Sequence, residues 1–357
     1  MTEPMATARR LVLEYGWNAT AYQILNPGIE LWFARAGDAV IGFVRHRRMR
    51  VVAGAPVCAP ERLADVAAEY EADAAARRER VCYFAAESRF ESLPRADGPY
   101  ARVLLGAQPV WRPQQLLATI AGRASLRAQL ARARNHGVQV TEWERTTAEQ
   151  HPGLQRCLAE WLATRGLPPL HFLVEPDTLE QVMDRRVFVA ERGGAPVAYL
   201  VASPIPRRRG WLVEQIVRGH NACNGTSELL LFAAATALAR AGAEHLTLGL
   251  APLTQQCSAG EPPPRWLRWT LGWLRAHGRR FYNFAGLEAF KAKFRPEHWE
   301  PVFALAPCRQ ITPAVLYAIA GAFARTSPLL LCARGLLRAI AAEHRRLWRW
   351  LRRRRRR

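Results

Sequence analysis

The sequence predicts an α/β fold of two domains, residues 1–110 and 111–310, followed by a basic amphipathic helical tail over 311–357. A chain of 357 residues is longer than one compact core usually holds, which indicates two domains. Strand patterns alternate with alanine-rich helical patterns in both halves, which favours the α/β class. Arginine accumulates at the C-terminal end, where residues 323–357 contain 12 arginines and one glutamate.

Composition limits the kinds of protein that this chain can be. Half of the residues are hydrophobic and 23% are charged, which is typical of a globular protein rather than a disordered one. The net charge of +21 favours a phosphate-rich partner, either a nucleic acid or an anionic membrane. The 7 cysteines are scattered without a Cys-x-x-Cys pair, so we expect a reducing cytosol and neither a disulfide framework nor a zinc knuckle.

The sequence carries no membrane-spanning signal. The N-terminus lacks the apolar core of a signal peptide. The longest candidate stretch, Thr312 to Ala324, is shorter than the roughly 18–20 apolar residues that cross a bilayer. We therefore expect a soluble or a peripheral protein.

Periodicity and turn residues predict the elements of both domains. In the first domain they are a helix or turn over 14–26, strands over 29–34, 39–45, 50–55, 81–86 and 100–105, and a helix over 60–80. The second domain is expected to contain a basic helix over 123–136, a helix around 151–165, a hairpin over 186–203 and an aromatic helix over 266–277. The basic helix carries arginines that suit either a solvated face or an RNA backbone, namely Arg123, Arg127, Arg132 and Arg134.

The unit from Trp211 to Leu250 is the most informative in topology. It is predicted as a strand to Arg218, a polar loop over 219–225, a helix over 226–241 and a second strand over 244–250. Such a crossover exposes backbone N–H groups at the helix N-terminus, which favours an anion or a carbonyl there. Acyl-CoA transferases of the GNAT class bind cofactor phosphates with this unit, but the loop here lacks their usual glycine-rich pattern.

Common catalytic and metal-binding patterns are absent. The sequence has no Gly-x-Ser-x-Gly, no Walker loop and no His-Glu-x-x-His. His220 and Cys223 are three residues apart without further ligands nearby, so we expect no metal site and read His220 as a loop residue.

The stretch from Phe281 to Trp299 holds Lys291 and Lys293, the only two lysines among the 51 basic residues. Lysine is a compact charge whose pKa shifts readily, whereas arginine is a planar fork that stays charged. Two explanations remain open: a function that needs an amine, or chance, with Lys291 pairing to Glu288 one helical turn earlier. In a helix the two lysines lie on either flank of one apolar stripe, so we expect one in a site and the other at its rim.

The residues after Pro313 alternate apolar side chains with arginines and end in six arginines. This pattern favours an interfacial helix that contacts anionic lipid headgroups. A basic tail that contacts RNA and a solvated run of charges are the alternatives.

Several stretches together resemble a known family. They are Leu248-Gly-Leu-Ala-Pro-Leu253, Tyr282-Asn-Phe-Ala-Gly-Leu287 and Phe290-Lys-Ala-Lys-Phe-Arg-Pro-Glu-His-Trp299, with Gly16-Trp-Asn and Val52-Ala-Gly-Ala-Pro56 in the first half. Over roughly residues 10–308 the chain resembles the C-terminal catalytic domain of the multiple peptide resistance factor family, the phosphatidylglycerol lysyl- and alanyltransferases.

The resemblance implies two GNAT-like acyltransferase domains in tandem. It implies transfer of an aminoacyl group from aminoacyl-tRNA to the glycerol hydroxyl of phosphatidylglycerol or a related lipid, with aminoacyl-tRNA as co-substrate and no further cofactor. The expected partners are aminoacyl-tRNA and an anionic membrane, the expected location is cytoplasmic and peripheral on the inner face of the membrane, and the expected role is resistance to antimicrobial peptides. Because the family's many-helix membrane half is not in this sequence, we expect residues 325–357 to make the membrane contact.

The resemblance also gives candidate site residues. Arg218 matches the family's strand-end arginine and is expected to bind phosphate, and Glu228 is expected to hold the ammonium group of the amino acid. Lys291 and Lys293 are expected to bind phosphate or to stabilise the developing oxyanion. Besides these four catalytic candidates, the substrate-binding candidates are Glu214, Gln215, Asn224, Gly225, Thr226, Tyr282 and Asn283.

The chain departs from the family pattern at two places. Gln215 stands where the family usually has an aspartate, and the adjacent Glu214 faces the opposite side of a strand. Arg279-Arg280 stand where an acidic residue is usual. Two other functions therefore remain under consideration: acyl-CoA-dependent N-acylation by an ordinary GNAT enzyme, and a non-catalytic relative that binds membrane or tRNA.

Overall fold

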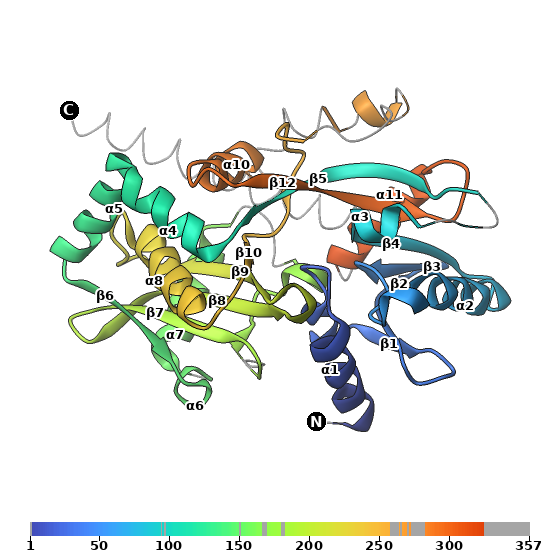
Figure 1. Cartoon of the computed structure of the whole chain (residues 1–357), viewed down its shortest axis with the longest axis horizontal. Coiled ribbons are helices and arrows are strands. Elements are labelled where there is room, and N and C mark those ends of the chain that lie inside the picture. The colour runs from blue at the N-terminus through green and yellow to red at the C-terminus, as the bar shows by residue number, and fades with distance from the viewer. Residues whose placement is uncertain are drawn as a thin grey trace, which may run out of the picture.

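The computed structural model describes residues 2–93, 95, 98–149, 151–165, 170–179, 183–257, 264, 266–269, 271–272 and 283–324 (Figure 1). The described strands form one sheet in the order β1-β2-β3-β4-β12-β5-β10-β9-β8-β7-β6, with β11 paired to β5. Helices α4, α5 and α8 lie at one end of this sheet and α2 lies at the other (Figure 1).

The strands are β1 Glu30–Phe33, β2 Val40–His46, β3 Met49–Ala53, β4 Arg80–Glu87, β5 Ala101–Trp111, β6 Val138–Trp143, β7 Arg186–Arg192, β8 Ala195–Ile205, β9 Gly210–Arg218, β10 His245–Thr247, β11 Ala251–Pro252 and β12 His298–Ala306. The α-helices are α1 Glu3–Tyr15, α2 Leu63–Ala76, α3 Ser88–Glu91, α4 Pro113–Gly122, α5 Ala124–Asn135, α6 Arg145–Ala148, α7 Pro152–Ala163, α8 Thr226–Arg240, α10 Phe284–Ala292 and α11 Pro313–Ala324. Short 3-10 turns are η1 Tyr22–Leu25, η2 Pro60–Arg62, η3 Phe172–Val174 and η5 Pro206–Arg208.

The sheet consists of two halves with the same connectivity. Among the described strands, β3 pairs with β4 in parallel and β10 pairs with β9 in parallel, while the other ladders are antiparallel. A helix connects each parallel pair, α2 in the first half and α8 in the second. Each half is thus an antiparallel meander that ends in a strand–helix–strand crossover, and the predicted α/β fold of two GNAT-like halves is confirmed.

The two halves exchange strands where they meet. β5 follows β4 in the chain but pairs with β10, whereas β12 follows the second half and pairs with β4. β5 and β12 pair with each other from His298↔Val110 to Ala306↔Ala101. The predicted boundary at residue 110 therefore falls at the end of a strand that both halves share, and 298–306 pack with both.

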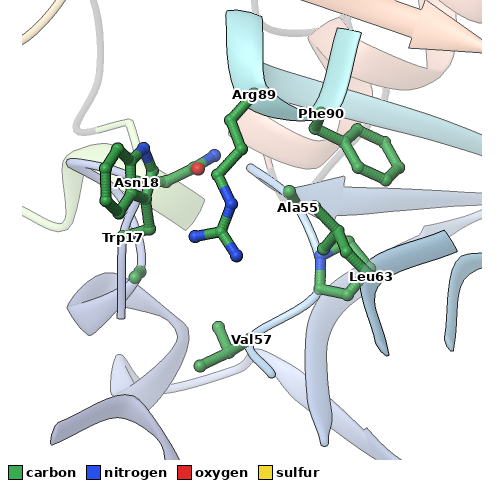
Figure 2. Close-up of a pocket in the computed structure, with 9 residues that line it drawn as sticks. Trp17, Asn18, Ala55, Val57, Leu63, Arg89 and Phe90 are labelled. Carbon is green, nitrogen blue, oxygen red and sulfur yellow. The ribbon is translucent and has the colours of Figure 1, made fainter. Parts of the chain in front are cut away.

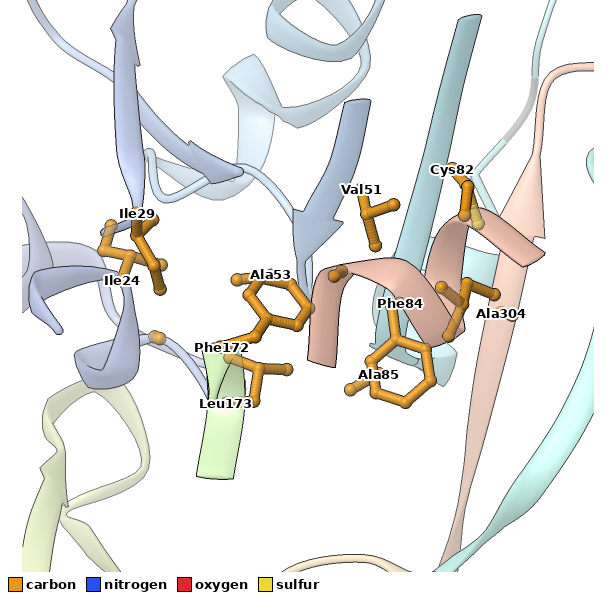
Figure 3. Packing of buried hydrophobic residues seen from close by; sticks show 14 of the residues in the cluster. Ile24, Ile29, Val51, Ala53, Cys82, Phe84, Ala85, Phe172, Leu173 and Ala304 are labelled. Atoms are coloured by element: carbon orange, nitrogen blue, oxygen red, sulfur yellow. The ribbon is translucent and has the colours of Figure 1, made fainter. Parts of the chain in front are cut away.

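Helix α11 belongs to the core of the first half. Its residues Val315, Ala318 and Ile319 are buried with side chains of α1, β3 and β4 in one hydrophobic cluster. Figure 3 shows Phe172 and Leu173 of η3 packing into the same cluster beside Phe84. The first part of the predicted tail over 311–357 is thus a packed helix, and the arginine-rich part, 325–357, lies outside the described residues.

Several elements differ from the prediction. Strands β6 and β12 and the short helices α3 and α6 were not predicted, and β5 runs to Trp111, whereas the predicted strand ends at residue 105. Helices α1 and α4 were also not predicted, although each has a proline in its first turn, a position that proline favours. The strand predicted over 244–250 ends at Thr247, because the chain turns at Gly249, whose φ is 68°. No helix in the described ranges has the length and the apolar character that a bilayer crossing requires.

Candidate active site

The loop between β9 and α8 is closed by hydrogen bonds to its own carbonyl groups. Arg218 Nη2 donates to the carbonyl oxygens of Ala222 at 3.1 Å and Cys223 at 3.2 Å. Thr226 is buried, and its hydroxyl donates to the Cys223 carbonyl at 2.8 Å. Arg218 and Thr226, both predicted to contact substrate, therefore shape this loop, and Arg218 keeps a buried Nε without a partner.

Helix α5 packs against the beginning of α8. Gly225 has a φ of 95°, and a Cβ atom there would collide with the backbone carbonyl of Gln129 in α5. Only glycine fits this position, since other residues would add both strain and a clash. Asn224, the preceding candidate, is exposed in the loop.

Glu228 and Lys293 meet at the first turn of α8. The Lys293 ammonium group donates to Glu228 Oε1 and lies 4.0 Å from the centre of the Phe290 ring. The Glu228 side chain is 12% exposed and that of Lys293 is 29% exposed. The backbone carbonyl of Lys293 accepts a hydrogen bond of 2.6 Å from Arg123, which fixes this segment to the start of α5. The fold thus brings two predicted site residues, 65 positions apart in sequence, into direct contact.

Lys291 points the other way, into the protein. It is 4% exposed, and its Nζ donates to the carbonyl oxygens of Gly249 at 2.7 Å and Leu250 at 2.8 Å. Burial lowers the pKa of this lysine to about 7. The ammonium group therefore bonds to the turn after β10 and not to Glu288, the partner expected if the lysines stand there by chance. The two lysines have different neighbours, which agrees with the prediction that they do not share a face.

Glu214 and Gln215 serve different parts of the structure. Glu214 forms a buried ion pair with Arg185 at 2.8 Å and accepts a hydrogen bond from Gln23 of the first half. Gln215 donates to the carbonyl oxygens of Glu175 at 2.6 Å and Pro176 at 3.0 Å. Glu214 thus joins the two halves, and Gln215 positions the segment next to η3.

The remaining predicted residues have structural contacts or lie outside the described ranges. Asn283 is exposed and caps α10, since its Oδ1 accepts a hydrogen bond of 3.1 Å from the Gly286 N–H. Tyr282 lies outside the described residues. His220 is an exposed loop residue whose N–H donates to Glu160 at 2.7 Å. Within the described ranges, no group of His, Cys, Asp and Glu side chains is placed to hold a metal ion.

A buried carboxylate cluster at the junction of the halves was not predicted. It consists of Glu87, Gln108, Arg208 and Glu300. Gln108 donates to Glu87 at 3.1 Å and to Glu300 at 3.0 Å, and Arg208 donates to Glu300 at 2.8 Å. The backbone N–H of Ala19 also donates to Glu87, at 2.8 Å. These residues come from β4, β5, β12 and η5, so sequence spacing gives no signal of the cluster beyond isolated charges in strand patterns.

The two carboxylates of this cluster titrate in opposite directions. Burial raises the pKa of Glu87 to about 7. Burial acts on Glu300 in the same direction, but the Arg208 guanidinium outweighs it and lowers the pKa of Glu300 to about 2. Burial also lowers the pKa of the adjacent His245 to about 4. At neutral pH Arg208 therefore pairs with the ionised Glu300 and also lies 3.5 Å from Glu87, whose carboxyl group is partly protonated.

Comparison with protein families identifies the chain. Residues 9–306 match the family model described as phosphatidylglycerol lysyltransferase, C-terminal. The chain belongs to this family. Membership of this lysyltransferase family supports aminoacyl transfer to a lipid as its general activity, which is the resemblance that the sequence blocks predicted. No curated protein matches the sequence.

Solved structures share the fold of this lysyltransferase-family chain. The C-terminal domain of a putative lysylphosphatidylglycerol synthetase from Agrobacterium fabrum is 23% identical, with a TM-score of 0.75 over 90% of this chain and 97% of that chain. L-PGS from Bacillus licheniformis is 18% identical, with a TM-score of 0.76 over 90% of this chain and 97% of that chain. FemX is 10% identical, with a TM-score of 0.52 over 89% of this chain and 98% of that chain. At these identities the likeness concerns the fold.

Proposed function

We propose that this protein transfers an aminoacyl group from aminoacyl-tRNA to the glycerol hydroxyl of phosphatidylglycerol or a related lipid. The observation that carries the proposal is the arrangement of polar groups around the end of α10 in a chain of this family. On one side, Lys293 pairs with Glu228 at the first turn of α8. On the other, the buried Lys291 amine faces the turn after β10.

The reaction exchanges one ester for another. The oxygen of the lipid hydroxyl attacks the ester carbonyl carbon of the aminoacyl-tRNA, and a new ester bond forms. The bond from that carbon to the ribose oxygen of the tRNA breaks, and the proton lost by the lipid hydroxyl ends on the ribose oxygen. Because its pKa is about 7, Lys291 is present in both protonation states near neutral pH, which suits a group that relays this proton.

Glu228 is the proposed partner of the amino acid's ammonium group. Its carboxylate is 12% exposed and already binds an ammonium group, that of Lys293. An ammonium group of the substrate can replace it without leaving the carboxylate unpaired, which would be costly in a partly buried site. Lys293 is then free to face the phosphate of the lipid or the developing oxyanion.

Helix α5 is the proposed contact for tRNA. It carries arginines and no acidic residue, and it packs directly on the loop of the site through Gln129. Arg132 and Arg134 are exposed, so they can reach phosphate groups. Residues 325–357 are the proposed contact with the inner face of the cell membrane, because leucine and tryptophan alternate there with arginine.

Lipid analysis tests the proposed reaction. The purified protein is incubated with charged tRNA and phosphatidylglycerol vesicles, and the extracted lipids are analysed by mass spectrometry. We expect a lipid that is heavier by one aminoacyl residue with charged tRNA and none with uncharged tRNA. No new lipid with any charged tRNA would contradict the proposal. Binding of a CoA thioester would favour the GNAT alternative, and saturable tRNA and lipid binding without turnover would favour the non-catalytic one.

The tRNA contact has its own test. Arg132→Gln removes one exposed charge from α5, and Arg48→Gln removes one from a distant exposed turn of the first half. We expect the first variant to lower the salt dependence of tRNA binding by about one phosphate contact and the second to leave it unchanged. Equal behaviour of the two variants would show that α5 is not the contact.

A further inference from the structure

A small pocket lies in the first half, where the loop after β3 approaches α2 and α3. Figure 2 shows the side chains that surround it, which include Trp17, Asn18, Ala55, Val57, Leu63 and Arg89. Arg89 extends from α3 into the middle of the pocket, with Trp17 and Asn18 on one side and apolar side chains on the others (Figure 2). None of these residues belongs to the candidate active site.

The Arg89 guanidinium group lacks an anionic partner. Its Nη2 is buried and has no hydrogen-bond acceptor. Within the described part of the chain its one specific contact is the Trp17 ring, whose centre lies 5.0 Å from the guanidinium carbon. A buried N–H group without an acceptor costs about 1–3 kcal/mol, and more when it carries charge. The pocket is therefore lined by a partly buried guanidinium group with one buried N–H donor that no described residue accepts.

A second unsatisfied donor comes from Asn18. This residue is 8% exposed, and its Nδ2 has no hydrogen-bond partner. Gly54 lies next to the Asn18 side chain. Its φ is 76°, and a Cβ atom on it would lie 2.9 Å from Asn18 Nδ2. Glycine thus leaves the amide uncovered by a neighbouring side chain. Two donors of different chemistry, a guanidinium and an amide, remain unused around one pocket.

Other ionisable groups among the described residues act on Arg89 without forming a hydrogen bond or an ion pair with it. Burial lowers its pKa, Cys58, Glu87 and Glu61 act to raise it, and the positive charge of Arg207 acts to lower it. The Arg207 N–H donates to the Gly16 carbonyl at 3.0 Å, which places η5 beside the Trp17 segment. Arg208 also lies over the Trp17 ring, at 5.4 Å from its centre, but it forms an ion pair with Glu300. An anion in the pocket would pair with the guanidinium group of Arg89.

We propose that this pocket binds an oxygen atom of a phosphate group. A guanidinium fork with an amide beside it matches phosphate oxygens in charge and geometry. The cavity has a volume of about 10 Å³, which is room for one atom the size of a water oxygen. One phosphate oxygen therefore enters, and the rest of the group stays at the mouth. Free phosphate and the headgroup of an anionic phospholipid both present this oxygen. The site is independent of the proposed transfer reaction.

Phosphate titration tests the site. Binding of inorganic phosphate is measured by calorimetry at constant ionic strength for the full chain, for Arg89→Gln and for the control Arg48→Gln, which removes the same charge from an exposed turn of the same half. We expect the dissociation constant for phosphate to rise at least roughly tenfold in Arg89→Gln, because one charged hydrogen bond is lost, and to stay unchanged in the control. Equal binding by all three proteins, or no binding by the unaltered chain, would overturn the proposal.

Thermal unfolding gives a second readout that a purely structural arginine would not give. Without phosphate, Arg89→Gln should unfold at the same or a higher temperature, since it removes a charged group whose buried Nη2 has no acceptor. Phosphate should raise the unfolding temperature of the unaltered chain and not that of the variant. Should the variant fail to fold, crystals of the unaltered chain soaked in selenate decide: a selenium anomalous peak within hydrogen-bond distance of Arg89 Nη2 supports the site, and its absence refutes it.

Vesicles distinguish the two sources of phosphate. Binding to phosphatidylglycerol vesicles and to phosphatidylcholine vesicles is measured in phosphate-free buffer for Arg89→Gln and Arg48→Gln. A larger loss of phosphatidylglycerol binding for Arg89→Gln assigns the pocket to a lipid headgroup. Equal vesicle binding, together with Arg89-dependent phosphate binding, assigns it to free phosphate.

Discussion

The two crossovers, β3–α2–β4 and β9–α8–β10, share a topology but differ in what packs at the start of the helix. Each helix has one acidic residue in its first turn, Asp65 in α2 and Glu228 in α8. The Asp65 side chain is 73% exposed and lies 3.4 Å from Arg62, whereas that of Glu228 is 12% exposed and pairs with Lys293. Similar sequence positions thus give a mostly exposed carboxylate in one half and a mostly buried one in the other.

A buried ionisable group also lies at or against the end of the second strand of each crossover. In the first half this group is Glu87, at the end of β4, and in the second it is Lys291, which bonds to the turn after β10. Burial brings the pKa of both groups to about 7, from below for the acid and from above for the base. Both crossovers therefore contain a helix N-terminus with an acidic residue, and the elements that pack against it determine which ionisable groups are buried there.

The largest expected effect is that of Lys291→Met on the transfer reaction. Loss of the amine that relays the proton should lower the rate of lipid product formation by about 10²–10⁴-fold. The matched control is Lys293→Met, which removes an amine from the same stretch but leaves the buried one, and we expect it to lose less. A rate for Lys291→Met similar to that of the unaltered chain would show that the buried lysine has only a structural role.

Glu228→Gln and Asp65→Asn compare the two first-turn acids directly. Glu228→Gln should lower kcat/KM for aminoacyl-tRNA by roughly 100-fold, since the ammonium group loses its charged partner. Asp65→Asn, in the other crossover, should leave the activity unchanged. Steady-state kinetics with charged tRNA measures both, and an equal loss in the two variants would remove the distinction between the halves.

Gly225→Ala and Gly54→Ala compare the backbone at the two crossovers. At Gly225 the added Cβ meets the carbonyl of Gln129, which is backbone and cannot move aside. At Gly54 it meets the ends of the Thr20 and Asn18 side chains, which can turn away. Both changes add left-handed strain of about 1–2 kcal/mol, and Gly225→Ala adds roughly 1–3 kcal/mol of overpacking.

Urea unfolding of these glycine variants measures the difference. Gly37→Ala serves as a control, because Gly37 also has a positive φ, 69°, but nothing lies near its added Cβ. We expect the stability to fall least for Gly37→Ala and most for Gly225→Ala. A Gly225→Ala variant as stable as the Gly37→Ala variant would mean that α5 does not press on the loop.

The last prediction concerns two opposite contributions to the pH dependence of stability. Between about pH 4.5 and 7 the folded protein keeps a proton on Glu87 that the unfolded chain releases, so Glu87 makes stability fall as the pH rises; the buried His245, whose pKa is lowered from 6.5 to about 4, acts in the opposite direction below about pH 6.5. Between about pH 7 and 10.5 the unfolded chain keeps a proton on Lys291 that the folded protein releases, so Lys291 makes stability rise with pH; above about pH 9 the buried thiols of Cys58 and Cys82, whose pKa values are raised to about 12, act in the opposite direction. Each slope is at most about 1.4 kcal/mol per pH unit.

Each slope can be removed separately. In urea unfolding at a series of pH values, the stability of Glu87→Gln should increase relative to that of the unaltered chain as the pH rises to 7, and the difference should stay constant above pH 7. The stability of Lys291→Met should decrease relative to that of the unaltered chain as the pH rises above 7, with a constant difference below pH 7. If neither variant changes the profile, the two groups titrate at their ordinary pKa values in the folded protein.

The sequence alone determined most of the elements and the family. Apolar periodicity predicted the strand that ends at Arg218 and the helix that begins at Thr226. A strand or helix that buries one face repeats its apolar residues at a fixed spacing, and this spacing can be read from the local sequence. The blocks around Lys291 and Leu248 were sufficient to indicate the lysyltransferase family, which residues 9–306 match. The separation of the two lysines also followed from helical geometry.

Only the tertiary structure decided which charges are buried and with whom. Gln108 and Glu300 are 192 residues apart, and they meet because β5 and β12 are exchanged between the halves. The surroundings of Lys291 depend likewise on a distant segment, the turn after β10. Those of Arg89 depend on the segment that contains Trp17. Periodicity records which face of an element is apolar, whereas the pairing of a charge depends on which other element covers it, and that is a property of the whole fold.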